Sequence, residues 1–180
     1  MEVNEPAVKY HPKMTAEAYL EWERKQPYKH EYVEGEIADM AGASAKHNKI
    51  LTNIIRKEGT FLEGKSCEIY PSDLRIFVKS KESYFYPDAT IICGELEFAD
   101  NVNETVTNPS VIFEILSPST QDYDIGRKLF FYMQIESLKE YIIIDSASRN
   151  IRIGRKKENN SWQFQELTNE NDIISITAIQ

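Results

Sequence analysis

Residues 110–120 have the sequence Ser-Val-Ile-Phe-Glu-Ile-Leu-Ser-Pro-Ser-Thr, and this stretch decides the fold prediction. Its apolar run is broken only by Glu114, which is typical of a strand that is buried on both faces. The Ser117-Pro118 dipeptide ends the strand, because proline cannot donate a ladder hydrogen bond. Ser119 or Thr120 can then cap the start of a helix. The stretch therefore predicts a buried strand followed directly by a helix.

The sequence after this strand completes a strand–helix–strand unit. The helix is predicted to extend to about residue 136, and the apolar run Tyr141–Ile144 predicts another buried strand. A strand, a crossover helix and a second strand place the two strands parallel in one sheet. The sequence therefore predicts an α/β fold with a mixed β-sheet flanked by helices.

Segments on both sides of this unit extend the prediction. Thr15 can cap a short helix through Arg24, and residues 44–62 have an amphipathic helical period. Two hairpins are expected, one around Glu34-Gly35-Glu36 within residues 30–40 and one formed by residues 150–155 and 162–167. Further strands are predicted at residues 66–70, 73–78, 86–93 and 173–177, with irregular structure at residues 1–14 and a surface loop at residues 94–108. Because no linker interrupts this order, we expect a single domain over residues 1–180.

Composition limits the class of protein. The 180 residues are 41% hydrophobic and 28% charged, which is ordinary for one globular domain. No apolar run approaches the roughly eighteen residues that a membrane span needs, and we expect no membrane partner. The net charge of −8 weighs against strong non-specific binding to nucleic acid.

Cysteine and histidine usage gives two further expectations. Cys67 and Cys93 have no metal-ligand spacing, so reduced thiols and a cytoplasmic location are expected. His11, His30 and His47 are too far apart in the sequence to predict a zinc cluster.

Two carboxylates occur where an ionised acid is costly. Asp88 follows Pro87 at the start of the predicted strand 86–93, and Glu114 interrupts the buried run described above. An ionised acid is almost never fully buried without a partner. The natural partner for two converging acids is a hard divalent cation, so the pair indicates a magnesium-type site.

Lys128 is the third candidate for chemistry. It lies three residues after Ile125 and four before Tyr132, which places it at the edge of the inward face of the predicted helix. There it could orient a water molecule and balance the charge of a phosphate. Alternatively, its stem packs on apolar surface while the ammonium group reaches solvent.

Several segments occur in an order that resembles a known family. They are Glu31–Ile37, Tyr86–Ala89, Phe113–Thr120, Asp124–Lys128 and Glu140–Tyr141. The pattern resembles the Uma-type family of bacterial restriction endonucleases, which belongs to the PD-(D/E)XK nuclease superfamily. The string Glu-x-Leu-Ser-Pro-Ser-Thr followed by the lysine-bearing helix is its most specific part.

This resemblance implies a restriction-endonuclease-like core, with additions at both ends of the chain. By similarity, Asp88 and Glu114 bind Mg²⁺, for which Mn²⁺ can substitute, and the backbone carbonyl of Ile115 is a further ligand. The Glu-x-Lys motif usual in the superfamily is absent, since position 116 is Leu. The family supplies the lysine from the next helix, which corresponds to Lys128.

Three accessory residues are weaker candidates. Asp73 lies near a position where the family carries an acid, but a turn aspartate bonded to nearby backbone is equally consistent. Glu36 lies in the matching hairpin, with a solvated strand acid as the alternative. His47 could contact substrate phosphate at a helix N-terminus, or it could be a partly buried structural histidine.

The function expected from the resemblance and the acids is metal-dependent hydrolysis of phosphodiester bonds in DNA by a homodimeric endonuclease. The dimer follows only from analogy with nucleases of this fold. Two alternatives remain: a catalytically inactive module of the same fold that binds nucleic acid or protein, and a metal-dependent hydrolase of a small phosphorylated substrate.

Overall fold

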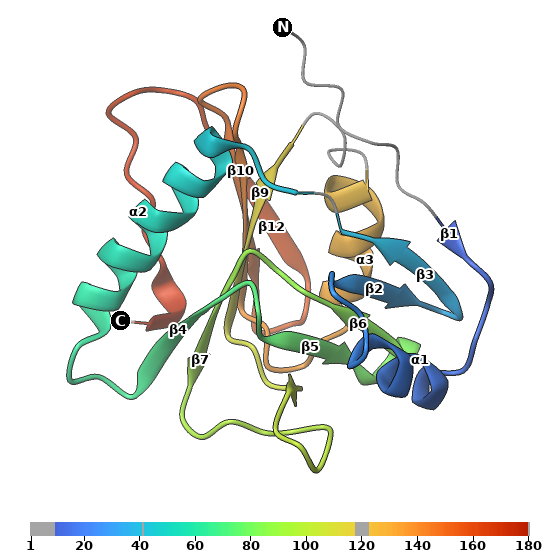
Figure 1. Ribbon diagram of the computed structural model, residues 1–180. Helices are drawn as coiled ribbons and strands as arrows, with labels where there is room; N and C mark the ends of the chain where they lie inside the picture. The colour runs from blue at the N-terminus through green and yellow to red at the C-terminus, as the bar shows by residue number, and fades with distance from the viewer. Residues whose placement is uncertain (1–9, 41, 118–122, 180) are drawn as a thin grey trace, which may run out of the picture.

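The computed structural model describes residues 10–40, 42–117 and 123–179, which form two mixed β-sheets with helices packed against them (Figure 1). The central sheet has the strand order β12-β11-β10-β9-β7-β4. Its strands are β4 (Cys67–Pro71), β7 (Ala89–Cys93), β9 (Val111–Leu116), β10 (Glu140–Asp145), β11 (Ile151–Lys156) and β12 (Trp162–Leu167). Strands β9 and β10 are parallel, as the strand–helix–strand pattern predicts, and the other neighbours in this sheet are antiparallel.

The second sheet has the strand order β1-β3-β2-β6-β5-β8. Its strands are β1 (Tyr10–His11), β2 (His30–Val33), β3 (Glu36–Asp39), β5 (Arg75–Val78), β6 (Ser83–Phe85) and β8 (Thr105–Val106). The early hairpin predicted around Glu34-Gly35 is confirmed as β2 and β3, and Gly35 has the positive φ of 94° that such a turn requires. Glycine adopts this backbone conformation without steric cost.

Two helices have a hydroxyl at the N-terminal cap, and only the cap at Thr15 is predicted from the sequence. Helix α1 (Ala16–Glu23) is capped by the Thr15 hydroxyl, and α2 (Ala45–Leu62) is capped by Ser44. The third helix differs from the prediction: Tyr123–Lys128 form a π-helical turn that continues into α3 (Leu129–Tyr132), so it ends well before residue 136. Its predicted caps, Ser119 and Thr120, lie outside the described residues.

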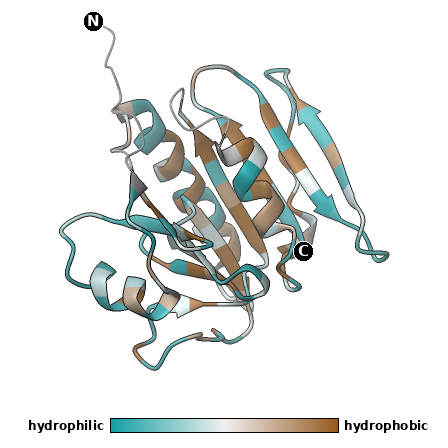
Figure 2. Cartoon of the chain, turned by 90° about the vertical axis from the view of Figure 1, so that its right-hand side faces the viewer, coloured by the Kyte–Doolittle hydropathy of each residue, from teal (hydrophilic) through white to brown (hydrophobic). Residues whose placement is uncertain are grey.

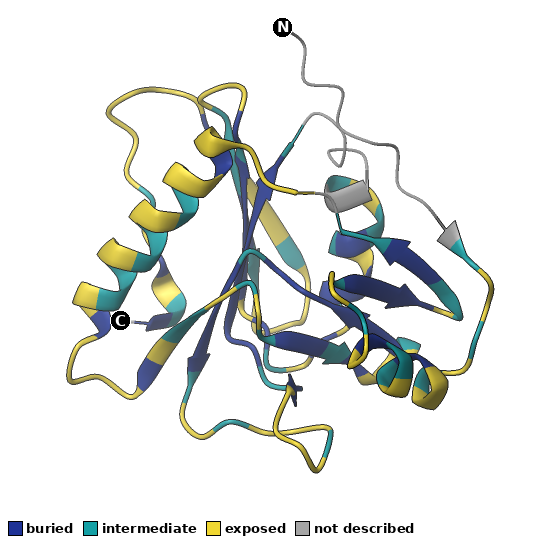
Figure 3. Cartoon of the chain, viewed as in Figure 1, coloured by how far each residue is buried: buried dark blue, intermediate teal, exposed yellow. Residues whose placement is uncertain are grey.

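Three apolar clusters hold these layers together. Alternation along β9 sends Val111, Phe113 and Ile115 toward α2, while Ile112 and Leu116 face α3 and the second sheet. A third cluster of Tyr19, Tyr32, Ile37 and Tyr84 lies between α1 and the second sheet. The inner strands are buried while the outer side of α2 is exposed (Figure 3), and Figure 2 shows the hydrophobic strands inside a hydrophilic periphery.

Some predicted boundaries are wrong, and tertiary contacts explain why. The predicted strand 86–93 begins only at Ala89, because the chain passes at Pro87-Asp88 from β6 in the second sheet to β7 in the central sheet. The predicted strand 173–177 is absent: residues 177–179 form a 3-10 turn, and Ile176 and Ile179 pack in the cluster beneath α2. Within the segment expected to be irregular, Tyr10–His11 pair with β3, and residues 1–9 lie outside the described residues. The predicted surface loop 94–108 ends in β8.

The cysteine expectation is also wrong. Cys67 and Cys93 form a disulfide, because the antiparallel register of β4 and β7 places them directly opposite each other. The argument for a cytoplasmic location from reduced thiols therefore fails. Among the described residues, no helix combines the length and apolarity needed to cross a membrane.

Candidate active site

Asp88 lies at the bend where the chain enters the central sheet. Its Oδ2 accepts a hydrogen bond of 2.7 Å from the backbone N–H of Ile115, and its Oδ1 lies 3.1 Å from Nε2 of His47. Ala89 pairs with Phe113 in the β7–β9 ladder, so the residues just beyond that pair, Asp88 and Glu114, lie opposite each other. The fold therefore brings together two acids that are 26 residues apart in the sequence.

Glu114 is buried at the centre of this site, with 3% of its surface exposed. It lies on the face of β9 that packs toward α3, where its Oε1 accepts hydrogen bonds from the Tyr132 hydroxyl (2.9 Å) and from Nζ of Lys128 (3.2 Å). Burial, and next the Glu114 carboxylate, raise the pKa of Tyr132 well above its usual value. Tyr132 therefore remains a neutral donor that holds the carboxylate in place.

Lys128 is buried rather than solvated. Only 5% of its surface is exposed, and its Nζ lies 2.9 Å from Glu31 Oε1 as well as 3.2 Å from Glu114 Oε1. The alternative in which its ammonium group reaches solvent is therefore wrong. Lys128 is the last residue of the π-helical turn, and such turns occur frequently at functional sites.

Glu31 also belongs to this cluster, although it is not among the site residues proposed from the sequence. It is 4% exposed in β2, and its Oε1 also accepts a hydrogen bond of 3.3 Å from the backbone N–H of Tyr86. A signal was present: Glu31 alternates with Val33, which places both on the face that packs toward α3. A charged residue in such a position needs a partner, and Lys128 supplies it.

The accessory candidates separate into two groups. His47, in the first turn of α2, is 8% exposed and contacts Asp88. Glu36 is partly exposed and pairs with Lys13 (3.5 Å) and Arg127 (3.6 Å). The Asp73 side chain is 86% exposed, and it pairs with Lys29 away from the buried acids. The structure thus gathers His47 with Asp88, Glu114 and Lys128, and leaves Glu36 and Asp73 outside.

Comparison with known proteins identifies the family. A family model described as "Putative restriction endonuclease", Uma2, matches residues 16–180. The chain belongs to the Uma2 family. This family is part of the restriction-endonuclease-like PD-(D/E)XK superfamily, and the mixed sheets flanked by helices are consistent with that fold.

Two curated relatives from Synechocystis sp. match over most of their length. The uncharacterized protein sll1609 is 39% identical over 167 residues, covering 93% of this chain and 94% of the relative. The uncharacterized protein slr1290 is 34% identical over 151 residues, covering 84% of this chain and 78% of the relative. Family membership indicates a nuclease, and neither relative's name specifies an activity.

The residues of this candidate site fit a hard divalent cation. Glu114 is buried and the Asp88 side chain is only 17% exposed, and both offer carboxylate oxygens, the ligands that Mg²⁺ prefers. In the described part of the chain, these acids do not form a group of three side-chain ligands within 4.8 Å of one another. Backbone and water oxygens would therefore complete the coordination, which is usual for Mg²⁺.

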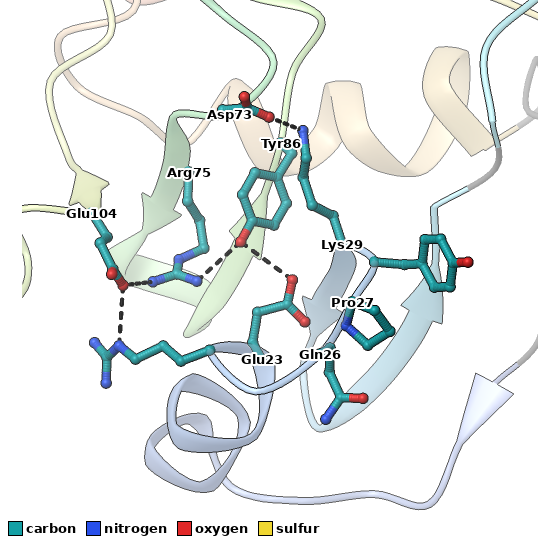
Figure 4. Close-up of a pocket in the computed structure, with 10 residues that line it drawn as sticks. Glu23, Gln26, Pro27, Lys29, Asp73, Arg75, Tyr86 and Glu104 are labelled. Carbon is teal, nitrogen blue, oxygen red and sulfur yellow. Dashed lines mark hydrogen bonds and ion pairs between the residues drawn. The ribbon is translucent and has the colours of Figure 1, made fainter.

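Tyr86, whose backbone N–H donates to Glu31, also lines a cavity of about 580 Å³ (Figure 4). The buried Arg75 donates from Nη1 to the Tyr86 hydroxyl (3.0 Å), which donates to Oε1 of Glu23 (3.3 Å). Burial, the largest cause, raises the pKa of Tyr86 to about 12. Of the residues proposed from the sequence, Asp73 lines this cavity, paired with Lys29 at its rim.

Proposed function

We propose that this protein is a metal-dependent endonuclease that hydrolyses phosphodiester bonds in DNA. The observation that carries the proposal is the position of Asp88, whose carboxylate is fixed on the Ile115 N–H opposite Glu114, with Lys128 buried beside Glu114. Membership of the Uma2 family supports the same class of activity. A structural role alone gives no reason to gather these acids, because buried carboxylates destabilise a fold unless they are well compensated.

Asp88, Glu114 and the backbone carbonyl of Ile115 would hold the cation, which we propose to be Mg²⁺ with Mn²⁺ as a substitute. When bound, it would lower the pKa of a water ligand and neutralise charge on the scissile phosphate. Tyr132 and His47 contact the carboxylates of Glu114 and Asp88, respectively, and so orient them. Contacts of this kind commonly change metal affinity or activity 10- to 100-fold when they are removed, an order-of-magnitude range.

Lys128 is proposed to position the nucleophilic water or a phosphate oxygen. Glu31 and Glu114 hold its ammonium group from two sides, so its place is fixed before substrate binds. The charge that develops on the phosphate would then meet a cation that needs little rearrangement. Glu31 acts through Lys128 and is therefore a positioning residue.

DNA as the substrate, a homodimer and a cytoplasmic location belong to the same proposal. The family supports a nucleic-acid substrate, whereas the net charge of −8 requires the DNA contact to be local. A homodimer would present two sites to the two strands, and light scattering after gel filtration would measure its mass. The cytoplasm contains the proposed substrate, but the disulfide gives this location no support.

The test is nicking of supercoiled plasmid at low salt with Mn²⁺ or Mg²⁺, using wild type, Glu114→Gln and the control Glu36→Gln. Glu36→Gln removes an equal charge from a residue outside the cluster. We expect wild type and the control to nick, and Glu114→Gln to lose about 100-fold or more. Equal nicking by all three proteins would refute the site.

Two other outcomes distinguish the rival functions. Salt-dependent DNA binding without cleavage by wild type would indicate the inactive binding module. Metal-dependent hydrolysis of a small phosphate ester, with no action on DNA or RNA, would indicate the small-substrate hydrolase.

A further inference from the structure

A second group of metal-ligating side chains lies on the other sheet, away from Asp88 and Glu114. Strands β1, β3 and β2 are neighbours in that order (Figure 1). His30 pairs directly with Asp39, and His11 pairs with Ile37, which is two residues before Asp39. Directly opposed residues, and residues two apart on one strand, point to the same face of a sheet. The register therefore places His11, His30 and Asp39 on the face that α1 covers.

The distances bring three ligand atoms together. Nε2 of His11 lies 2.5 Å from Oδ1 of Asp39, and Nε2 of His30 lies 3.6 Å from the same oxygen. One ligand atom from each residue lies within 4.8 Å of the other two. The histidines were expected to be too far apart in the sequence for a zinc cluster, but strand pairing brings His11 and His30 together.

Glu23, the last residue of α1, orients His30. Its Oε2 accepts a hydrogen bond of 2.9 Å from Nδ1 of His30, and its Oε1 accepts one of 2.9 Å from the His30 backbone N–H. Both residues are 7% exposed. A carboxylate that accepts from Nδ1 leaves Nε2 as the unprotonated nitrogen of a neutral ring. This is the carboxylate–histidine arrangement that commonly supports a metal-bound imidazole.

We propose that His11, His30 and Asp39 form a second metal site, which binds a divalent transition-metal ion of the Zn²⁺ type. Two imidazoles and one carboxylate suit Zn²⁺ and its neighbours in the first transition series, whereas the oxygen ligands at Asp88 and Glu114 suit Mg²⁺. Three protein ligands leave a coordination position for water or another ligand. The two sites therefore differ in their metal preference as well as their place in the fold.

The observed spacing is close to what such an ion requires. Two ligands held about 2.1 Å from Zn²⁺ at a tetrahedral angle lie about 3.4 Å apart. The separation of 3.6 Å between His30 and Asp39 matches this value. The 2.5 Å contact between His11 and Asp39 would have to open by about 1 Å on binding. His11 lies on a two-residue strand and its side chain is 34% exposed, so the adjustment involves few packing contacts.

The same contacts could instead form only an ion pair that holds β1 against β3. Asp39→Asn separates the two explanations. The amide oxygen of asparagine can still accept a hydrogen bond from an imidazole, but the site loses its anionic ligand. The ion-pair explanation predicts no specific metal binding by wild type, whereas the metal-site proposal predicts binding that Asp39→Asn removes.

The experiment is calorimetric titration of Zn²⁺, together with Co²⁺ absorption spectroscopy, on protein without a polyhistidine tag. Excess Mg²⁺ is present to occupy the oxygen-ligand site, and reductant is omitted so that Cys67 and Cys93 remain bonded. The variants are His11→Ala, Asp39→Asn and Glu23→Gln, with Glu36→Gln as a matched loss of charge from the same strand as Asp39.

We expect one equivalent of Zn²⁺ to bind wild type and Glu36→Gln equally, with visible Co²⁺ absorption typical of low coordination number. Affinity should fall more than about 100-fold in His11→Ala and Asp39→Asn, and about 10- to 100-fold in Glu23→Gln. Absence of Zn²⁺ binding to folded wild type would overturn the proposal, and so would binding that His11→Ala and Asp39→Asn leave unchanged. Neither result depends on nuclease activity, so this proposal and the nuclease proposal can fail separately.

Discussion

Replacing Lys128 by methionine tests whether its ammonium group is buried between two carboxylates. Methionine keeps most of the side-chain length and removes the charge. Nζ lies 2.9 Å from Glu31 and 3.2 Å from Glu114, and the three residues are between 3% and 5% exposed. Removing one partner of a buried ion pair destabilises a protein by about 3–5 kcal/mol, because it leaves uncompensated charge. For a chain of this size, that loss lowers the melting temperature by on the order of 10 °C.

Arg127→Met provides the matched control. Arg127 is the neighbouring residue, and its pair with Glu36 spans 3.6 Å between side chains that are 37% and 36% exposed. A solvent-exposed pair of this kind contributes less than about 1 kcal/mol. We therefore expect Lys128→Met to be much more destabilising than Arg127→Met, although both replace a cation by methionine in the same helical turn.

The assay is urea unfolding in the presence of a chelator, so that no bound cation compensates the lost charge. Glu31→Gln is added to Lys128→Met to complete a double-mutant cycle. Lys128→Met leaves the Glu31 carboxylate buried without its cationic partner, and Glu31→Gln removes that charge. The double variant should therefore be more stable than Lys128→Met, with a coupling energy of about 1–3 kcal/mol. A cost below about 1 kcal/mol for Lys128→Met, or strictly additive effects, would refute the buried triad.

Three further predictions concern other parts of the structure. Purified protein should contain no reactive thiol before reduction, and free thiols in the native protein would contradict the disulfide. Replacing Cys67 and Cys93 by serine should lower the free energy of unfolding by about 3–4 kcal/mol, the chain-entropy estimate for a 26-residue separation. Asp73→Asn should change the nicking rate by less than about twofold, because this side chain is 86% exposed and its partner is Lys29. A large loss of nicking activity would instead show that Asp73 contributes to the active site. Because burial raises the pKa of Tyr132 and raises that of Tyr86 to about 12, their stabilising contribution is complete below pH 10 and is lost as pH rises through these folded-state values. Ultraviolet titration should therefore show these tyrosines ionising together with alkaline unfolding, and full ionisation in the folded protein near pH 10 would contradict their burial.

Local sequence patterns were sufficient for much of the fold. The apolar run around Glu114, the proline that ends it and the next apolar run predicted the parallel pair β9 and β10. The Thr15 hydroxyl marked the start of α1, and the amphipathic period of residues 44–62 marked α2. These features depend on hydrogen bonds and apolar faces within a few residues of each other, so a single segment contains the information.

The features that the sequence did not reveal depend on contacts between distant strands. Glu31 on β2 reaches Lys128 in a helical turn far along the chain, and His11 meets His30 because their strands flank β3. The disulfide likewise depends on the register of β4 and β7. One residue of slippage in a strand would turn these side chains to the opposite face, and no local pattern fixes the register between strands this far apart.

Anomalous X-ray scattering from crystals grown with Mn²⁺ would be the sharpest test of the proposed metal site, because it locates the cation without requiring a DNA sequence that the protein cuts. We expect an anomalous peak bounded by the Asp88 and Glu114 carboxylates and the Ile115 carbonyl, and we expect its loss in Glu114→Gln crystals. A peak confined to His11, His30 and Asp39, or no peak at saturating Mn²⁺, would contradict a metal-dependent active site at Asp88 and Glu114.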